Sequence, residues 1–152
     1  MTNQAPFHLT DRAKRVLGRA RDEQARLGHR QLTAEHILYG LLADLHSVAV
    51  WVLRELKVDV KGLTERTRSE LERGASTPVV DQTMVVRAAE RWAAELKQVS
   101  VGTEHLLLGL VTSGSAAATW LAEAGVRESE AKSATERVLP VAQRRSGPSA
   151  MP

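Results

Sequence analysis

The sequence predicts an all-α protein of eight helices, built as two four-helix repeats that pack with pseudo-two-fold symmetry. Three observations lead to this prediction. Apolar residues recur at helical spacing along most of the chain. Ten glycines and five prolines in 152 residues leave little room for the turns of an all-β fold. A ten-residue segment also occurs twice. We therefore expect no strand between residues 10 and 139.

The composition is that of a globular domain, with 43% hydrophobic and 26% charged residues. Cysteine is absent, which excludes disulfides, thiolate nucleophiles, iron–sulfur clusters and Cys-based zinc sites. No apolar run reaches the 18 or so residues of a membrane span, and Met1 to Phe7 lacks the features of a signal peptide. These features predict a cytoplasmic protein with no membrane association.

Four helical patterns fill the first half of the chain. The first covers residues 10–27 and is followed by Gly28, a good residue for a helix C-terminus. The fourth ends at Gly74. Each pattern follows a residue whose side chain suits an N-cap: Thr10, Thr33, Ser47 and Asp59.

The second half repeats the first. Residues Leu32 to Leu41 match Val101 to Leu110 at an offset of 69, and Val52-Leu53 matches Trp120-Leu121 at an offset of 68. The change of offset implies a one-residue deletion in the loop near Asp44 to Ser47. We expect the last helix over residues 128–139, ended by Pro140.

These boundaries divide the chain into an N-terminal lead (1–8), one domain (9–140) and a flexible tail (141–152). Within the domain, repeat one covers about 9–74, the linker 75–80 and repeat two about 81–140. Each four-helix unit is too small to bury an apolar face well, so the two should share one core. The leucines expected in that core are Leu38, Leu41, Leu42, Leu53, Leu107, Leu110 and Leu121.

The repeated segments resemble a known family. Leu9-Thr10-Asp11-Arg12-Ala13, Leu27-Gly28-His29 and the two Thr-Glu-His-like segments are similar to the double Clp repeat, the N-terminal domain of Clp-type unfoldase ATPases, and most similar to the ClpC branch. The resemblance implies a domain that takes up substrates and docks adaptors. In the ClpC branch it also implies recognition of phosphorylated arginine, with one pocket per repeat.

The sequence carries no Gly-x-x-x-x-Gly-Lys-(Ser/Thr) loop and no strained nucleophile turn. We therefore expect no enzymatic activity and no cofactor, and interpret the chain as a free-standing Clp N-domain that delivers or sequesters ligands. Its expected partners are Clp substrates, adaptors or Clp ATPase and protease subunits, with phosphoarginine or cyclic peptides as possible ligands.

The repeated core supplies the candidate ligand-binding residues. Thr33 and Thr103 lie where helices begin, so unpaired backbone N–H groups beside them favour an anion. Glu35 and Glu104 can each take a guanidinium in a forked pair. Thr10 matches a phosphate-side threonine of the family. The alternative is that each Thr-x-Glu is only an N-cap with a first-turn acid.

The repeats differ at the head of each unit. Val79 and Asp81 stand in repeat two where Thr10 and Arg12 stand in repeat one. The pocket of Thr10, Thr33 and Glu35 should therefore bind better than that of Thr103 and Glu104.

Other constellations have simpler interpretations. His29, His36 and His105 lack the spacing of metal ligands and are expected to be packing residues, so no metal site is predicted. The tryptophans Trp51, Trp92 and Trp120 fit a core better than a base-stacking platform. Arg12, Arg15, Arg19 and Arg26 form a helical stripe that could bind nucleic acid or anionic lipid, although a solvated face is the commoner explanation. The alternative function is thus a small basic nucleic-acid-associated helical protein.

Overall fold

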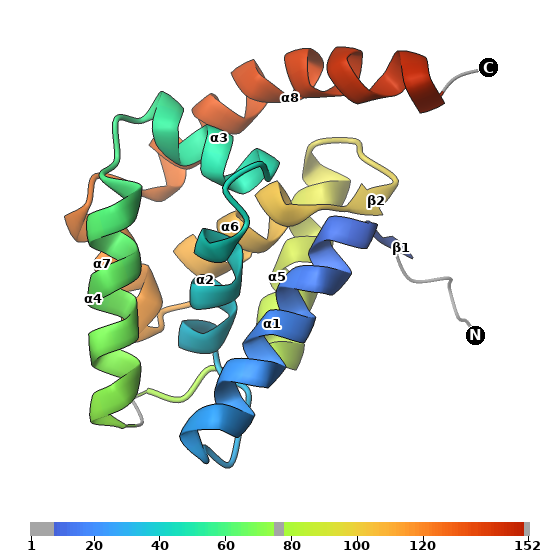
Figure 1. The fold of residues 1–152 in the computed structure, drawn as a ribbon. Helices are drawn as coiled ribbons and strands as arrows, with labels where there is room; N and C mark the ends of the chain where they lie inside the picture. The colour runs from blue at the N-terminus through green and yellow to red at the C-terminus, as the bar shows by residue number, and fades with distance from the viewer. Residues whose placement is uncertain (1–7, 75–77, 151–152) are drawn as a thin grey trace.

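The computed structural model describes residues 8–74 and 78–150, with side chains to Ala142. Within these ranges the chain forms eight helices and confirms the all-α prediction (Figure 1). Their bounds are α1 (Asp11–Leu27), α2 (Ala34–Ala43), α3 (Val48–Glu55), α4 (Val60–Arg73), α5 (Gln82–Glu95), α6 (Thr103–Val111), α7 (Ala116–Glu123) and α8 (Glu128–Ala150). Three of the four predicted N-caps, Thr10, Ser47 and Asp59, accept a backbone hydrogen bond at their helix start. Thr33 lies at the N-cap position of α2, but its side chain makes no such bond. Gly28 takes the left-handed conformation after α1, with φ of 71°.

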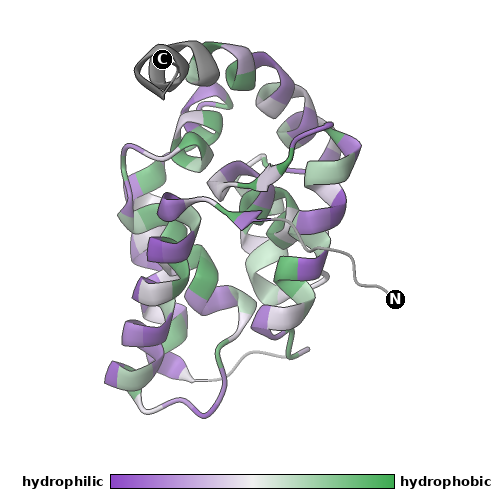
Figure 2. Ribbon diagram, turned by 90° about the vertical axis from the view of Figure 1, so that its right-hand side faces the viewer, coloured by the Kyte–Doolittle hydropathy of each residue, from purple (hydrophilic) through white to green (hydrophobic). Residues whose placement is uncertain are grey.

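Helices α2 and α6 lie at the centre of the core. Helix α1 packs on α2 and α5 packs on α6, so the two repeats have the same arrangement. All seven predicted core leucines are buried, and so is Trp120, whereas Trp51 and Trp92 are partly buried. Hydrophilic and hydrophobic residues alternate along the outer helices, as expected for amphipathic helices that cover a core (Figure 2).

Glycines at equivalent positions allow the close helix crossings. A Cβ atom at Gly40 would lie 2.5 Å from the carbonyl oxygen of Val16, and one at Gly109 would lie 2.9 Å from that of Val85. Because both contacts are to backbone, neither helix pair has room for a methyl group. The offset of 69 seen in the sequence therefore corresponds to matching packing in the structure.

The expectation of no strand is wrong at one place. Strand β1 (His8–Leu9) pairs in parallel with β2 (Ser100–Val101), and the Thr10 N–H donates to the Val101 carbonyl at 2.9 Å. Backbone N–H and C=O groups that are shielded from water need hydrogen-bond partners, and this pairing supplies them. Strands of two residues are too short to leave a periodic pattern in the sequence, so they could not be predicted.

The counterpart of the β1–β2 pairing joins the segment before α5 to the segment before α2. The Ala34 N–H donates to the Val80 carbonyl at 2.8 Å, and the Gln82 N–H donates to the Leu32 carbonyl at 3.1 Å. The segment that leads into each repeat therefore pairs with the segment before the central helix of the other repeat. The two repeats are interlocked by this exchange.

The last helix continues past Pro140, where we expected it to end. Proline removes one backbone donor and disfavours helix at the preceding residue. Val138 is nevertheless buried and Ala142 packs against the core, so tertiary contacts on both sides of the proline favour a continuous helix. The backbone is helical to Ala150. The predicted N-terminal lead and linker lie mostly or partly outside the described residues, which leave out 1–7, 75–77 and 151–152.

Among the described residues, no single helix is long and apolar enough to cross a membrane. Two bent pairs, α2 with α3 and α6 with α7, reach that length and composition together. Both central helices of these pairs are buried within the fold.

Candidate functional site

Two cavities contain the candidate binding residues. Cavity A has a volume of about 800 Å³ and lies where the starts of α1, α3 and α6 meet, beside α8. Cavity B has a volume of about 360 Å³ and lies between the start of α2 and the end of α4. Thr10, Thr103 and Glu104 line cavity A, whereas Thr33, Glu35 and Val79 line cavity B.

This distribution corrects the predicted grouping of the site residues. We expected Thr10 to share a pocket with Thr33 and Glu35, but it lies with Thr103 and Glu104. Val79, the counterpart of Thr10, lies with Glu35 instead. The exchanged pairing of the lead segments is the cause, since each lead brings its first residues to the central helix of the other repeat.

Glu104 is a buried carboxyl in cavity A. It is 6% exposed, and burial raises its pKa above the usual value. No hydrogen bond joins its carboxyl to another residue in the described part of the chain. A Cβ atom at position 102 would lie 2.5 Å from Glu104 Oε1, so Gly102 leaves the space that this carboxyl occupies.

The neighbouring His105 does not neutralise Glu104. Its Nδ1 lies 3.8 Å from Glu104 Oε2 but accepts a hydrogen bond from the Gly102 N–H at 2.9 Å. Burial also lowers the pKa of His105 to about 4. The imidazole is therefore neutral near pH 7 and acts as the N-terminal cap of α6, in the place that Glu or Gln takes in a capping box.

The rest of cavity A is lined by apolar residues such as Val48 and Leu139, by the acidic Asp11 and by polar and positive groups. Thr103 Oγ1 accepts the Ala49 N–H at 3.1 Å and so caps α3 from the other repeat. Arg12 Nη1 donates to both carboxylate oxygens of Asp44 at 2.8 Å. Burial alone would raise the pKa of Asp44, but hydrogen bonds from Arg12 and a backbone N–H hold it below its usual value. Arg15 is exposed at the rim and forms no ion pair with a described residue.

Glu35 in cavity B already has a partner. It is 2% exposed, and its Oε2 accepts the Ala117 N–H at 3.0 Å, which caps α7. Ala117 is the counterpart of Ala49, whose N–H is taken by Thr103 in cavity A. The two central helices thus cap each other's repeat, but they use different residues. The carboxylate of Glu35 is therefore engaged in a hydrogen bond within the fold, whereas the carboxyl of Glu104 makes no such bond to a described residue.

Two histidines form the wall of cavity B. The Thr33 N–H donates to His36 Nδ1 at 3.0 Å, so His36 carries its proton on Nε2 and donates it to His29 Nδ1 at 2.9 Å. Burial, followed by the nearby His29, lowers the pKa of His36 to about 4. Both residues are packing and capping groups, as the sequence suggested. No group of three or more potential metal ligands lies together within the described residues.

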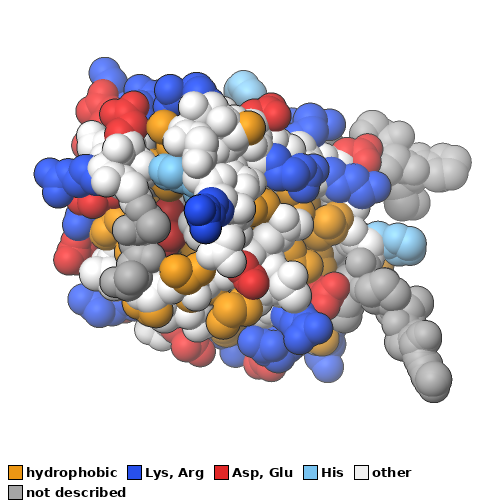
Figure 3. Space-filling model, turned by 90° about the horizontal axis from the view of Figure 1, so that it is seen from below, with side chains coloured by type: hydrophobic (Ala, Val, Ile, Leu, Met, Phe, Trp, Pro, Cys, Tyr) orange, Lys and Arg blue, Asp and Glu red, His pale blue; other side chains and the backbone are white. Residues whose placement is uncertain are grey.

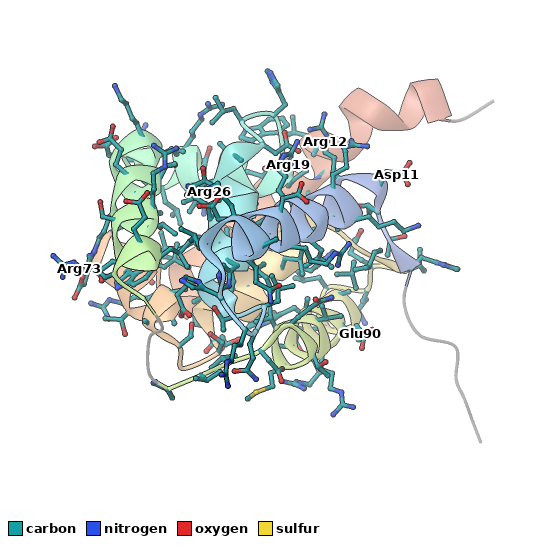
Figure 4. All side chains as sticks on the ribbon, turned by 60° about the horizontal axis from the view of Figure 1, so that its bottom comes forward. Asp11, Arg12, Arg19, Arg26, Arg73 and Glu90 are labelled. Atoms are coloured by element: carbon teal, nitrogen blue, oxygen red, sulfur yellow. The ribbon has the colours of Figure 1, made fainter. Side chains whose placement is uncertain are left out.

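The arginine stripe of α1 is partly neutralised by acids. Arg12 is paired with Asp44, and Arg26 with Glu23 at 2.6 Å. Figure 4 shows Arg12, Arg19 and Arg26 along one side of α1. These pairs reduce the positive charge on which the nucleic-acid alternative depends.

Comparison with known proteins agrees with a double repeat. The sequence profile described as "Clp repeat (R) N-terminal domain" matches residues 8–84 and again residues 77–152. The chain belongs to the Clp repeat N-terminal domain family.

Relatives of this Clp N-domain include full-length chaperones. "Chaperone protein ClpB" of Oceanobacillus iheyensis is 34% identical over 115 residues, which cover 72% of this chain and 14% of the relative. "Negative regulator of genetic competence ClpC/MecB" of Bacillus subtilis is 33% identical over 117 residues, with the same coverage of both chains. The chain thus spans about one seventh of the length of these relatives.

Solved N-domains share the fold. The Hsp104 N-terminal domain from Candida albicans has a TM-score of 0.69 at 16% identity, over 84% of this chain and 89% of that one. The N-terminal domain of ClpD from Arabidopsis thaliana has a TM-score of 0.65 at 18% identity, over 91% and 99%.

Proposed function

We propose that this chain is a non-catalytic binding module that takes up protein substrates, adaptors or peptide-like ligands for a Clp unfoldase–protease system. The observation that carries the proposal is cavity A. It brings Glu104, a buried carboxyl that makes no hydrogen bond to any other residue the structure describes, next to the hydroxyl-bearing helix starts at Thr10 and Thr103.

The chemistry of cavity A suits a ligand with a guanidinium and an adjoining anion. The carboxylate of Glu104 can accept a forked pair of hydrogen bonds from a guanidinium. The starts of three helices, together with Arg15 at the rim, favour a phosphate or carboxylate. Phosphoarginine, or an arginine next to an acidic group in a peptide, combines both charges in one ligand.

Cavity B is less suited to the same ligand. Its carboxyl group, Glu35, already holds the N-terminus of α7, and Val79 replaces the hydroxyl of Thr10. Asp81 pairs with Thr33 in an isolated bridge and adds a negative charge near this cavity. We therefore assign the principal binding site to cavity A, which reverses the order expected from the sequence.

Calorimetric titration with free phosphoarginine and with an arginine-containing peptide tests the assignment. Glu104→Gln keeps the shape of the side chain but removes the charge, and should weaken binding roughly ten- to a hundredfold. Glu35→Gln is the matched control and should change affinity by less than about threefold. Equal losses, or a larger loss for Glu35→Gln, would refute the assignment to cavity A.

The hydroxyl of Thr10 can be tested in the same titration. Thr10→Ser keeps both the N-cap bond to the Ala13 N–H and the hydroxyl, whereas Thr10→Val removes both. Weaker binding of phosphoarginine by Thr10→Val, with Thr10→Ser close to the wild type, supports a phosphate-side role. No binding of either probe by the wild type would reject phosphoarginine as the ligand.

A further inference from the structure

A second surface with binding character runs along the outer side of α5 and is distinct from both cavities. Two adjoining hollows of about 260 and 380 Å³ share Ala88, Arg91 and Thr112 as lining residues. We call this surface the α5 groove. It has no lining residue in common with cavity A or cavity B.

The α5 groove is mainly apolar near Met84 and mainly polar near Glu95 and Lys132. Ala88 is buried, and the partly buried Trp92 donates from Nε1 to Thr112 Oγ1 at 3.3 Å. Met84 is 53% exposed at one end, and Val79 close by is 45% exposed. Seen from below, the surface of the molecule shows hydrophobic side chains next to Lys and Arg side chains (Figure 3). Large apolar side chains that stay in contact with water beside a hollow are typical of an interaction surface.

The same place in repeat one is filled by the chain itself. Ala88 corresponds to Arg19, whose guanidinium reaches a buried position, with Nη1 shielded from solvent. Ser113, at the groove edge, corresponds to Asp44, whose carboxylate accepts a hydrogen bond from Arg12. The fold therefore does not require an open groove. Small residues at 88 and 113 create it in repeat two only.

The charges along the α5 groove indicate which kind of partner it can bind. Arg87 and Arg91 lie one turn apart on α5, are exposed along the groove, and form no ion pair with any residue that the structure describes. At the far end, the charge of Glu95 is matched by Lys132 at 3.4 Å, with Glu128 also present. The end of the groove near Met84 is therefore positive and apolar at once.

We propose that the α5 groove docks an extended acidic and apolar peptide segment of a partner protein. An apolar side chain lies over Ala88 between Met84 and Trp92, and flanking carboxylates pair with Arg87 and Arg91. Arginine pairs carboxylates in a forked geometry, and this contact is stronger than a neutral hydrogen bond. The proposal does not depend on ligand binding in cavity A.

Fluorescence anisotropy with three labelled ten-residue peptides tests this proposal. One alternates Glu and Leu, one alternates Lys and Leu, and one alternates Glu and Ser. Only the Glu–Leu peptide should bind, and its affinity should fall as salt rises. Arg91→Gln should weaken it roughly tenfold, and Ala88→Arg, which installs the residue found at the equivalent position in repeat one, should abolish it. Arg21→Gln, an exposed change on α1, is the matched control and should leave binding unchanged.

Several outcomes would overturn the proposal. Binding of the Glu–Leu peptide that survives both Arg91→Gln and Ala88→Arg would place it elsewhere, as would equal binding of the Lys–Leu peptide. Since Ala88 is buried, Arg91→Gln decides the matter if Ala88→Arg does not fold. A concentration-dependent dimer in sedimentation that Arg91→Gln disrupts would assign the groove to a second copy of the chain instead. Glu104→Gln should leave this binding intact, which separates it from the function proposed for cavity A.

Discussion

The two buried histidines that cap α2 and α6 should make the fold sensitive to mild acid. His36 and His105 each accept a backbone N–H through Nδ1, and burial is the largest cause that lowers the pKa of each from 6.5 to about 4. As pH falls, the unfolded chain takes up protons first. The stabilisation is therefore complete above pH 6.5 and is lost as pH falls towards 4.

The size of the effect follows from the two pKa values. A pKa that falls from 6.5 to about 4 corresponds to about 3 kcal/mol for each histidine, of which about 2.5 kcal/mol is lost by pH 4.5. Two such residues represent a large share of the 5–15 kcal/mol that is usual for a domain. Urea unfolding followed by circular dichroism at pH 7.5 and 4.5 should therefore show a marked loss of stability.

The variant His105→Gln separates the cap from the titration. Glutamine can accept the Gly102 N–H, as it does in a capping box, but it does not take up a proton. The variant should lose some stability at pH 7.5 and roughly half of the pH dependence. Exposed His8 provides the matched control, His8→Gln. Glu104 contributes with the opposite sign, because burial raises its pKa and its protonated form favours the fold, so the comparison is best made in a Glu104→Gln background. A stability that is equal at the two pH values in that background would refute the reasoning.

Three further predictions follow from single contacts. Thr103→Val removes the acceptor for the Ala49 N–H and should cost about 1–2 kcal/mol in urea unfolding, with recovery in Thr103→Ser; an unchanged midpoint would contradict a cap between the repeats. Gly40→Ala should destabilise by about 1–3 kcal/mol because the methyl group meets the backbone of α1, whereas Gly18→Ala has open space and should stabilise α1 by up to about 1 kcal/mol; similar effects at both sites would rule out steric packing as the cause. The affinity of cavity A for a guanidinium should rise with pH, because the ligand binds the carboxylate form of Glu104, whose pKa is raised by burial. Calorimetry in two buffers should detect the proton that Glu104 releases on binding, and release of the same proton by Glu104→Gln would exclude Glu104 as its source.

Most of the helical architecture could be predicted because its signals are local. An N-cap such as Ser47 or Asp59 and a C-terminal glycine such as Gly28 act within one turn of the helix, so the sequence carries them directly. The repeat offset also located the equivalent glycines, Gly40 and Gly109, although their role in close packing appears only in the structure. Pro140 misled the prediction of the last helix because the packing of its neighbours outweighs a local preference.

The composition of the site could not be predicted, because it depends on contacts between residues far apart in the chain. Thr10 and Glu104 meet only through the pairing of β1 with β2, and two paired residues leave no periodic pattern in a sequence. The prediction of the candidate residues assumed that each repeat builds its own pocket. That assumption fails when repeats interlock.

Because each lead segment pairs with the other repeat, a substitution at the head of repeat two affects the cavity of Glu35 and not that of Glu104. Val79 and Asp81 do not weaken the pocket of Glu104; they accompany Glu35, which already caps α7. Cavity B, which has Val79 where cavity A has Thr10, is therefore the one whose carboxylate caps α7. Cavity A, which has Thr10, is the one whose carboxyl makes no hydrogen bond to another described residue. Two independent changes converge on cavity B, so returning a hydroxyl at position 79 alone would still leave it without an available acid. Residues of both cavities therefore join the repeats, through Thr103 in cavity A and Glu35 in cavity B, but only in cavity A is the carboxyl left without such a bond to a described residue.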